Sequence, residues 1–139
     1  MQATPVVSGK RRGNVGKNPG RPAGASPGLR VPVIPPEAEH AAYKCYVFVE
    51  PAALKPGWDR DRVMGEIFAR GVPCYSGSCS EVYLEKAFDG TGWRPEERLP
   101  VARELGETSL MFLVHPGIGE AEIGRTVEVV GEVMGLAAG

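Results

Sequence analysis

Two segments of the chain alternate apolar and polar residues with the two-residue period of a β-strand. In residues 29–33, Leu29, Val31 and Val33 alternate with Arg30 and Pro32. Because proline has no amide hydrogen to donate, this segment is predicted to be an edge strand. Residues 42–49 form a stronger strand, with apolar side chains on both faces. We therefore expect the second strand to be covered on both sides.

Two further segments show the 3.6-residue period of amphipathic helices. The first lies between Asp59, a typical N-cap, and Gly71, a typical C′ residue. The second begins near Gly119, with Glu120 and Glu122 in a first turn where the helix dipole favours acidic residues. The predicted apolar stripes are Val63, Met64, Ile67 and Phe68 in the first helix, and Ile123, Val127, Val130 and Met134 in the second.

The region between these helices alternates short elements with turns. We expect a strand over 72–75, a helix over 81–88 capped by Ser80, a turn over 89–92, a helix from Pro100 to about residue 107 and a buried strand over 110–114. The order is strand, strand, helix, strand, helix, helix, strand, helix. It predicts an α/β (α+β) fold, with helices packed on a small mixed or antiparallel sheet, one face of which packs against something else.

Charge divides the 139 residues into two parts. Residues 1–36 contain six basic and no acidic residues, whereas the remainder contains ten basic and 17 acidic residues. Residues 1–27 are rich in glycine and proline, so we expect a disordered basic arm followed by one domain over 28–139. Lys10–Arg12 could contact nucleic acid, but a solvated tail is favoured because no aromatic residue is interleaved. We expect no nucleic-acid partner.

The three cysteines, Cys45, Cys74 and Cys79, cannot all form pairs. A zinc site or a catalytic pair of Cys79 with His115 is a minor alternative to ordinary thiols, and we expect no metal. No apolar run approaches the roughly 20 residues of a membrane span, and the N-terminus lacks the apolar core of a secretory signal. We therefore expect a cytoplasmic protein without a membrane partner.

Small polar residues gather in the loop after the predicted third strand. Ser76–Gly77–Ser78 would allow a ligand to approach the backbone closely, and Ser80 would open a helix whose free amides attract anions. The alternative is a polar turn that ends in a capping serine. His115 lies at the end of an apolar strand, where a satisfied strand-end histidine is the ordinary interpretation. Lys44 either snorkels to an edge or reaches into a pocket.

The order of these motifs resembles the C-terminal domain of the DegT/DnrJ/EryC1/StrS aminotransferases. The resemblance runs from Pro27 to Leu136. Its motifs are Pro27–Pro32, the strand with His40, Tyr43, Lys44 and Tyr46, Arg70–Gly71–Val72, the loop 73–83 with its helix to Phe88, Leu99–Ala102, and Ser109–Pro116. The resemblance implies the small C-terminal lobe of a fold type I pyridoxal-phosphate enzyme.

That family transfers an amino group from a donor, usually glutamate, to a keto nucleotide sugar. The resemblance implies a homodimer and places the Schiff-base lysine in a large N-terminal domain, so no catalytic or cofactor-binding residue is assigned here. It implies a wall of the substrate site made of Tyr75, Ser76, Ser78, Ser80, Tyr83 and His115.

Three expectations follow for the chain by itself. It is a fragment that is inactive alone and binds no pyridoxal phosphate. The composition change at Pro27 suggests a truncated or frame-disrupted gene product. The alternative is a stand-alone binding or regulatory module whose open sheet face meets a partner.

Overall fold

The computed structural model describes residues 26–41 and 43–139. Residues 1–25, on which the predicted basic arm falls, and residue 42 lie outside this description. The sheet has three antiparallel strands in the order β1 (Leu29–Arg30), β2 (Lys44–Val49) and β3 (Ser109–Leu113). As the alternation predicts, β1 is a short edge strand.

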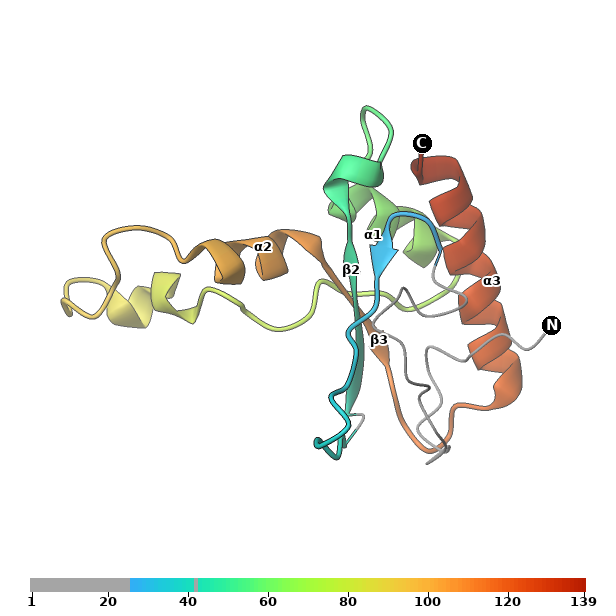
Figure 1. The fold of residues 1–139 in the computed structure, drawn as a ribbon, viewed down its shortest axis with the longest axis horizontal. Coiled ribbons are helices and arrows are strands. Elements are labelled where there is room, and N and C mark those ends of the chain that lie inside the picture. The colour runs from blue at the N-terminus through green and yellow to red at the C-terminus, as the bar shows by residue number, and fades with distance from the viewer. Residues whose placement is uncertain (1–25, 42) are drawn as a thin grey trace.

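Three α-helices complete the fold: α1 (Arg60–Ala69), α2 (Pro100–Thr108) and α3 (Glu120–Ala137). Helices α1 and α3 pack against one face of the sheet, whereas α2 lies on the other side and leads away from it (Figure 1). The predicted α/β (α+β) fold with helices on a small sheet is therefore confirmed, and the sheet is antiparallel.

The core lies between the sheet and the pair of helices α1 and α3. Its most completely buried side chains are Val63, Ile67, Leu110, Val129, Val133 and Met134. Phe68 was expected in the core but is 60% exposed, because it faces away from the side of α1 that packs against the sheet and α3. The buried side of α3 also differs from the predicted one. Of the four residues predicted for its apolar stripe, only Met134 is fully buried.

The ends of α1 follow the local signals in the sequence. Asp59 Oδ1 accepts a hydrogen bond from the Arg62 amide at 2.7 Å, as an N-cap does. At the other end Gly71 has a φ of 82°, which an L-residue adopts only with strain. Its amide donates to the Phe68 carbonyl at 2.9 Å, and the next amide, that of Val72, donates to the Ile67 carbonyl at 3.4 Å. This pair of hydrogen bonds is the Schellman ending of a helix.

Two predicted elements are corrected by the structure. Residues 72–75 run beside β3 but make only one bridge, between Tyr75 and Met111, because Pro73 has no amide to donate. Residues 81–88 form two 3₁₀ turns, Val82–Leu84 and Lys86–Phe88, and no α-helix. Ser80 caps neither turn.

A single arginine explains the second correction. The Arg94 guanidinium donates to the carbonyls of Tyr83, Leu84 and Glu85 at 2.8, 2.9 and 3.2 Å. An α-helix would use these carbonyls for its own ladder, so their capture by Arg94 favours tighter turns. Residues 79–108 therefore project from the sheet as two short turns beside α2 (Figure 1). From here on, "the arm" means these residues and not the predicted basic segment 1–27.

The sheet is covered unequally on its two faces. Val47 and Val49 of β2 are buried under the helices, whereas Lys44, Tyr46 and Phe48 on the opposite face are half-buried. The expected cover on both sides is therefore present on one side only. The strand register adds four residues to the second face, which we call the open face: its members are Arg30, Lys44, Tyr46, Phe48, Ser109, Met111 and Leu113. No helix among the described residues has both the length and the apolar character to cross a membrane.

Candidate functional site

The predicted ligand loop is attached to the open face by its first two residues. Tyr75 and Met111 exchange backbone hydrogen bonds of 3.0 and 2.7 Å, which place Tyr75 in one row with Met111 and Tyr46. The Ser109 hydroxyl donates to the Ser76 carbonyl at 2.5 Å. The loop therefore crosses the middle of the open face, where Met111 is buried although Tyr46 and Leu113 on the same face are not.

Gly77 lets the loop lie directly on an aromatic ring. Its φ of 91° is in the left-handed region, and a Cβ placed on it would lie 2.5 Å from Cε1 of Tyr46. Both observations require glycine at this position, one through backbone conformation and the other through contact. The loop is thus seated on the ring of Tyr46.

Ser78 then joins the loop to two side chains of β2. The Tyr46 phenol lies 3.1 Å from Ser78 Oγ and accepts a hydrogen bond from the Ser78 amide at 3.2 Å. Lys44 Nζ donates to Ser78 Oγ at 3.4 Å. Hydrogen bonding with the Ser78 side chain is the main cause that lowers the pKa of Tyr46; the Ser78 amide and the Lys44 charge add to it, and together they outweigh its partial desolvation.

The ammonium group of Lys44 reaches the exposed loop that was predicted to contact a ligand. Lys44 and Tyr46 were not among the predicted site residues. The signal that could have found them is their position on one face of the strand, beside a loop of small residues. Their pairing with Ser78 spans more than 30 positions in sequence, so no local pattern shows it.

Tyr83 and Ser80 lie in the arm, next to the loop but in a different network. The Tyr83 hydroxyl donates to Glu81 Oε1 at 2.7 Å and accepts from the Leu99 amide at 2.9 Å. The Glu81 carboxylate is also held by the guanidinium of Arg98, and these hydrogen bonds lower its pKa to about 2. Partial desolvation, together with the hydrogen bond to Glu81, raises the pKa of Tyr83.

Ser80 packs against α2. A Cβ on Gly106 would overlap Ser80 Oγ, so the absence of a side chain at Gly106 makes room for this serine. Both Ser80 and Tyr83 therefore hold the arm together, whereas Ser78 faces β2.

His115 lies beyond the end of β3, two residues after Leu113. The loop is bridged to the strand at Met111, four residues before this histidine. The histidine is exposed, and its Nδ1 accepts a hydrogen bond from the Gly117 amide at 3.2 Å. The structure therefore brings together Tyr75, Ser76 and Ser78, places Ser80 and Tyr83 beside them in the arm, and leaves His115 at the far end of the strand.

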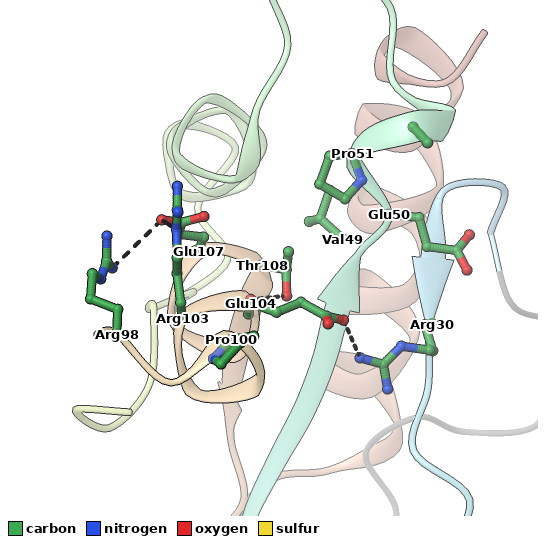
Figure 2. A pocket seen from close by; sticks show the side chains of 11 residues that line it. Arg30, Val49, Glu50, Pro51, Arg98, Pro100, Arg103, Glu104, Glu107 and Thr108 are labelled. Carbon is green, nitrogen blue, oxygen red and sulfur yellow. Dashed lines mark hydrogen bonds and ion pairs between the residues drawn. The ribbon is translucent and has the colours of Figure 1, made fainter. Parts of the chain in front are cut away.

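A surface hollow lies where α2 meets the end of β2, apart from the loop on the open face. It encloses about 610 Å³, and no residue of the predicted ligand loop lines it. Figure 2 shows its ion pairs, Arg30 with Glu104 at 3.7 Å and Arg98 with Glu107 at 3.7 Å; Arg103 also pairs with Glu107 at 2.8 Å. Because these charges are about half exposed and of both signs, the charged side chains that line the hollow pair only weakly with one another.

The cysteines do not form a common site. Burial raises the pKa of the Cys74 thiol to about 12 and that of Cys45 to about 11, so both are poor nucleophiles at neutral pH. Cys79 is exposed and donates to the Glu85 carboxylate at 3.4 Å. Within residues 26–41 and 43–139, no three metal-ligating side chains lie close enough together to hold an ion.

The three lysines of residues 26–41 and 43–139 do not form a site for pyridoxal phosphate. Lys55 Nζ is bonded to the Leu136 carbonyl at 2.9 Å, Lys44 lies on the open face, and Lys86 is exposed in a 3₁₀ turn of the arm. A Schiff-base lysine needs an enclosed cofactor cleft with a carboxylate for the pyridinium nitrogen. None of these three lysines lines the hollow beside α2, so the described residues do not fit this cofactor as a site of their own.

Solved structures of aminotransferases share this fold. An aminotransferase from Psychrobacter cryohalolentis is 60% identical and superposes with a TM-score of 0.69 over 70% of this chain and 25% of its own length. DesV from S. venezuelae, solved with a ketimine intermediate, is 24% identical with a TM-score of 0.64 over 78% of this chain and 27% of its own. A DegT DnrJ EryC1 StrS aminotransferase from Brucella abortus is 21% identical with a TM-score of 0.61, over 78% of this chain and 26% of its own.

This chain therefore spans about a quarter of the length of each of these enzymes. No family model and no curated protein matches it. The resemblance predicted from the sequence motifs is nevertheless confirmed by the structures, and the chain resembles one part of the aminotransferases that include the DegT/DnrJ/EryC1/StrS family.

Proposed function

We propose that this chain is a fragment of a pyridoxal-phosphate-dependent aminotransferase that acts on keto nucleotide sugars with glutamate as amino donor. In this proposal residues 28–139 are the small C-terminal domain of a homodimeric enzyme. The observation that carries it is the 60% identity to the Psychrobacter aminotransferase over 70% of this chain. The family supports the nucleotide sugar, the donor and the dimer; the accessible loop on the open face supports a contact with substrate.

The proposed contribution of this chain is substrate binding. The loop 75–78 lies on the open face, where its hydroxyl and backbone groups are accessible. When bound, pyridoxal phosphate supplies the electron sink for transamination, and the lysine that holds it would belong to the part of these aminotransferases that this chain does not match. We also propose a cytoplasmic location, because all three cysteines are free thiols, the state that a reducing compartment maintains.

The isolated chain is expected not to transaminate. Incubation with pyridoxal phosphate, followed by borohydride reduction and peptide mapping, should yield no adduct concentrated at one lysine. A single modified lysine together with turnover of glutamate and a keto nucleotide sugar would show that the chain is an enzyme by itself.

A chimera tests the positive part of the proposal. Residues 28–139 would replace the matching quarter of the Psychrobacter aminotransferase, and a host lacking that quarter would serve as the control. We expect the chimera to transaminate within about tenfold of the intact host and to accept keto nucleotide sugars from a panel of sugars. A folded, cofactor-loaded chimera without activity would contradict the proposal.

A second candidate function is a stand-alone binding module, and the arm favours it. Five large apolar side chains of the arm are exposed: Val82, Leu84, Trp93, Leu99 and Val101. Exposed apolar patches commonly mark sites where another protein packs. Sedimentation of the chain over a range of concentrations tests this candidate, because an inert monomer at all concentrations would argue against it.

A further inference from the structure

Three polar side chains converge at one place on the open face. Lys44 and Tyr46 project from alternate positions of β2, and Ser78 approaches them from the loop above. The loop is held there by contacts that do not involve these polar groups, namely the Tyr75–Met111 bridge and the hydrogen bond from Ser109 to Ser76. The cluster is therefore built into the fold and does not depend on a ligand to form.

The hydrogen-bond donors of the cluster exceed its acceptors. The Lys44 ammonium group has three donor hydrogens, of which the structure commits one to Ser78. The Tyr46 oxygen already accepts from the Ser78 amide. When the phenol donates to Ser78 Oγ, the serine hydroxyl hydrogen is left to point away from Tyr46. Two ammonium hydrogens and one hydroxyl hydrogen are then available to an incoming group.

The charge of Lys44 also has no carboxylate to neutralise it among the ion pairs of the described residues. Its neighbours are the ring of Tyr43, whose centroid lies 5.5 Å from Nζ, and Leu113 on the adjacent strand. Neither neighbour carries a negative charge, so the cluster is net positive. The pKa of Tyr46 is lowered mainly by the hydrogen bond with Ser78, and the Lys44 charge adds to this shift.

We propose that Lys44, Ser78 and Tyr46 bind the phosphate group of a small phosphate ester. A phosphate oxygen accepts several hydrogen bonds at once, and it gains most where a fixed ammonium charge lies beside hydroxyl and backbone donors. The substrate role of this ester rests on the proposed function, whereas the binding of phosphate does not. Lys44 is thereby a binding residue on β2, opposite the loop predicted to contact substrate.

Titration of the full ¹⁵N-labelled chain with inorganic phosphate tests the site, with chloride used to hold the ionic strength constant. We expect saturable shifts at the amides of residues 76–79, with a Kd on the order of 1 mM. Phenyl phosphate should shift the same amides, since the proposed ligand is an ester. If inorganic phosphate binds and phenyl phosphate does not, the ester assignment is wrong.

A matched pair of variants assigns the binding to Lys44. Lys44→Met keeps the length of the side chain and removes the charge, so it should weaken phosphate binding about tenfold or more. Lys86→Met removes the same charge from an exposed position in the arm and should leave the Kd within twofold. Ser78→Ala should weaken binding about three- to tenfold while the amide spectrum away from the loop stays unchanged.

The proposal is overturned if residues 76–79 show no saturable shift, or if Lys44→Met binds phosphate as well as Lys86→Met does. Failure of the phosphate site can be distinguished from failure of the proposed enzyme function by combining the titration with the chimera assay. Phosphate binding by the free chain with an inactive chimera would remove the proposed enzyme function and keep the site. An active chimera whose KM for the sugar nucleotide is unchanged by Lys44→Met would keep the function and show that the substrate does not bind through Lys44.

Discussion

Gly77 is the position at which the attachment of the loop to the sheet can be measured. Its φ of 91° and the 2.5 Å distance from a built Cβ to the Tyr46 ring predict two separate costs for Gly77→Ala. Gly90 offers a matched control, because its φ is 70° and a Cβ there would meet no atom within 4 Å. Gly90→Ala should therefore carry the backbone cost alone, about 1–2 kcal/mol.

The additional cost of Gly77→Ala has an upper bound set by the loop's own contacts. If the methyl group lifts the loop off the sheet, the chain loses the two hydrogen bonds between Ser78 and Tyr46, the one from Lys44 to Ser78 and the one from Ser109 to Ser76. At about 1 kcal/mol each, their loss amounts to about 4 kcal/mol. If the Tyr46 ring moves aside instead, overpacking costs about 1–3 kcal/mol. We therefore expect Gly77→Ala to cost about 1–3 kcal/mol more than Gly90→Ala.

Urea unfolding followed by tryptophan fluorescence gives both free energies, and amide spectra of the folded variants show whether the loop has lifted. A Tyr46→Ala background provides the decisive comparison. Removing the ring also removes the overlap, so the excess cost of Gly77→Ala should fall to near zero there. The reasoning is refuted if the two glycine variants lose equal stability, or if the excess persists without the Tyr46 ring.

Three further predictions follow from burial and charge. The pKa of Glu81 is about 2, against an ordinary value of 4.5, so the stability that its carboxylate contributes is complete above about pH 4.5 and is lost as the pH falls towards 2. Glu81→Gln should therefore flatten the acid dependence of the free energy of urea unfolding. An unchanged pH profile would contradict this prediction. Ile67→Ala should cost about 2–5 kcal/mol in urea unfolding, whereas Phe68→Ala should stay within about 0.5 kcal/mol, and similar costs would contradict the orientation of α1. In the native chain at pH 8, a thiol reagent should modify Cys79 rapidly and Cys74 only after unfolding; equal rates would exclude the burial assigned to Cys74.

Local rules predicted those elements whose signals lie within a few residues of one another. Asp59 and Gly71 bound α1 as capping chemistry requires, and Pro100 begins α2. The same rules failed between residues 81 and 88, where a short segment had only weak helical preference. There the Arg94 side chain, from several residues downstream, captures the carbonyls that a helix would have used.

Some residues of the candidate site were likewise predicted from local signals, and others were not. The residue pattern pointed to Ser76 and Ser78 as part of a small polar loop after a strand, and the family resemblance added Tyr75; the structure places these three on the open face. The residue pattern also suggested a helix N-terminus at Ser80 that would attract anions, and the structure has no such helix. The positive charge comes instead from Lys44, which periodicity marked only as a polar residue in a strand.

Sequence thus determined where the strands and long helices lie, because hydrophobic period, capping residues and proline act over one or two turns of chain. Tertiary structure alone decided which face of the sheet stays open, which side of α1 and α3 is buried, and which groups meet Ser78. Those outcomes depend on strand register and helix packing between distant segments, for which no residue carries a local signal. The pairing of Lys44 and Tyr46 with Ser78 exists only once β2, β3 and the loop have assembled.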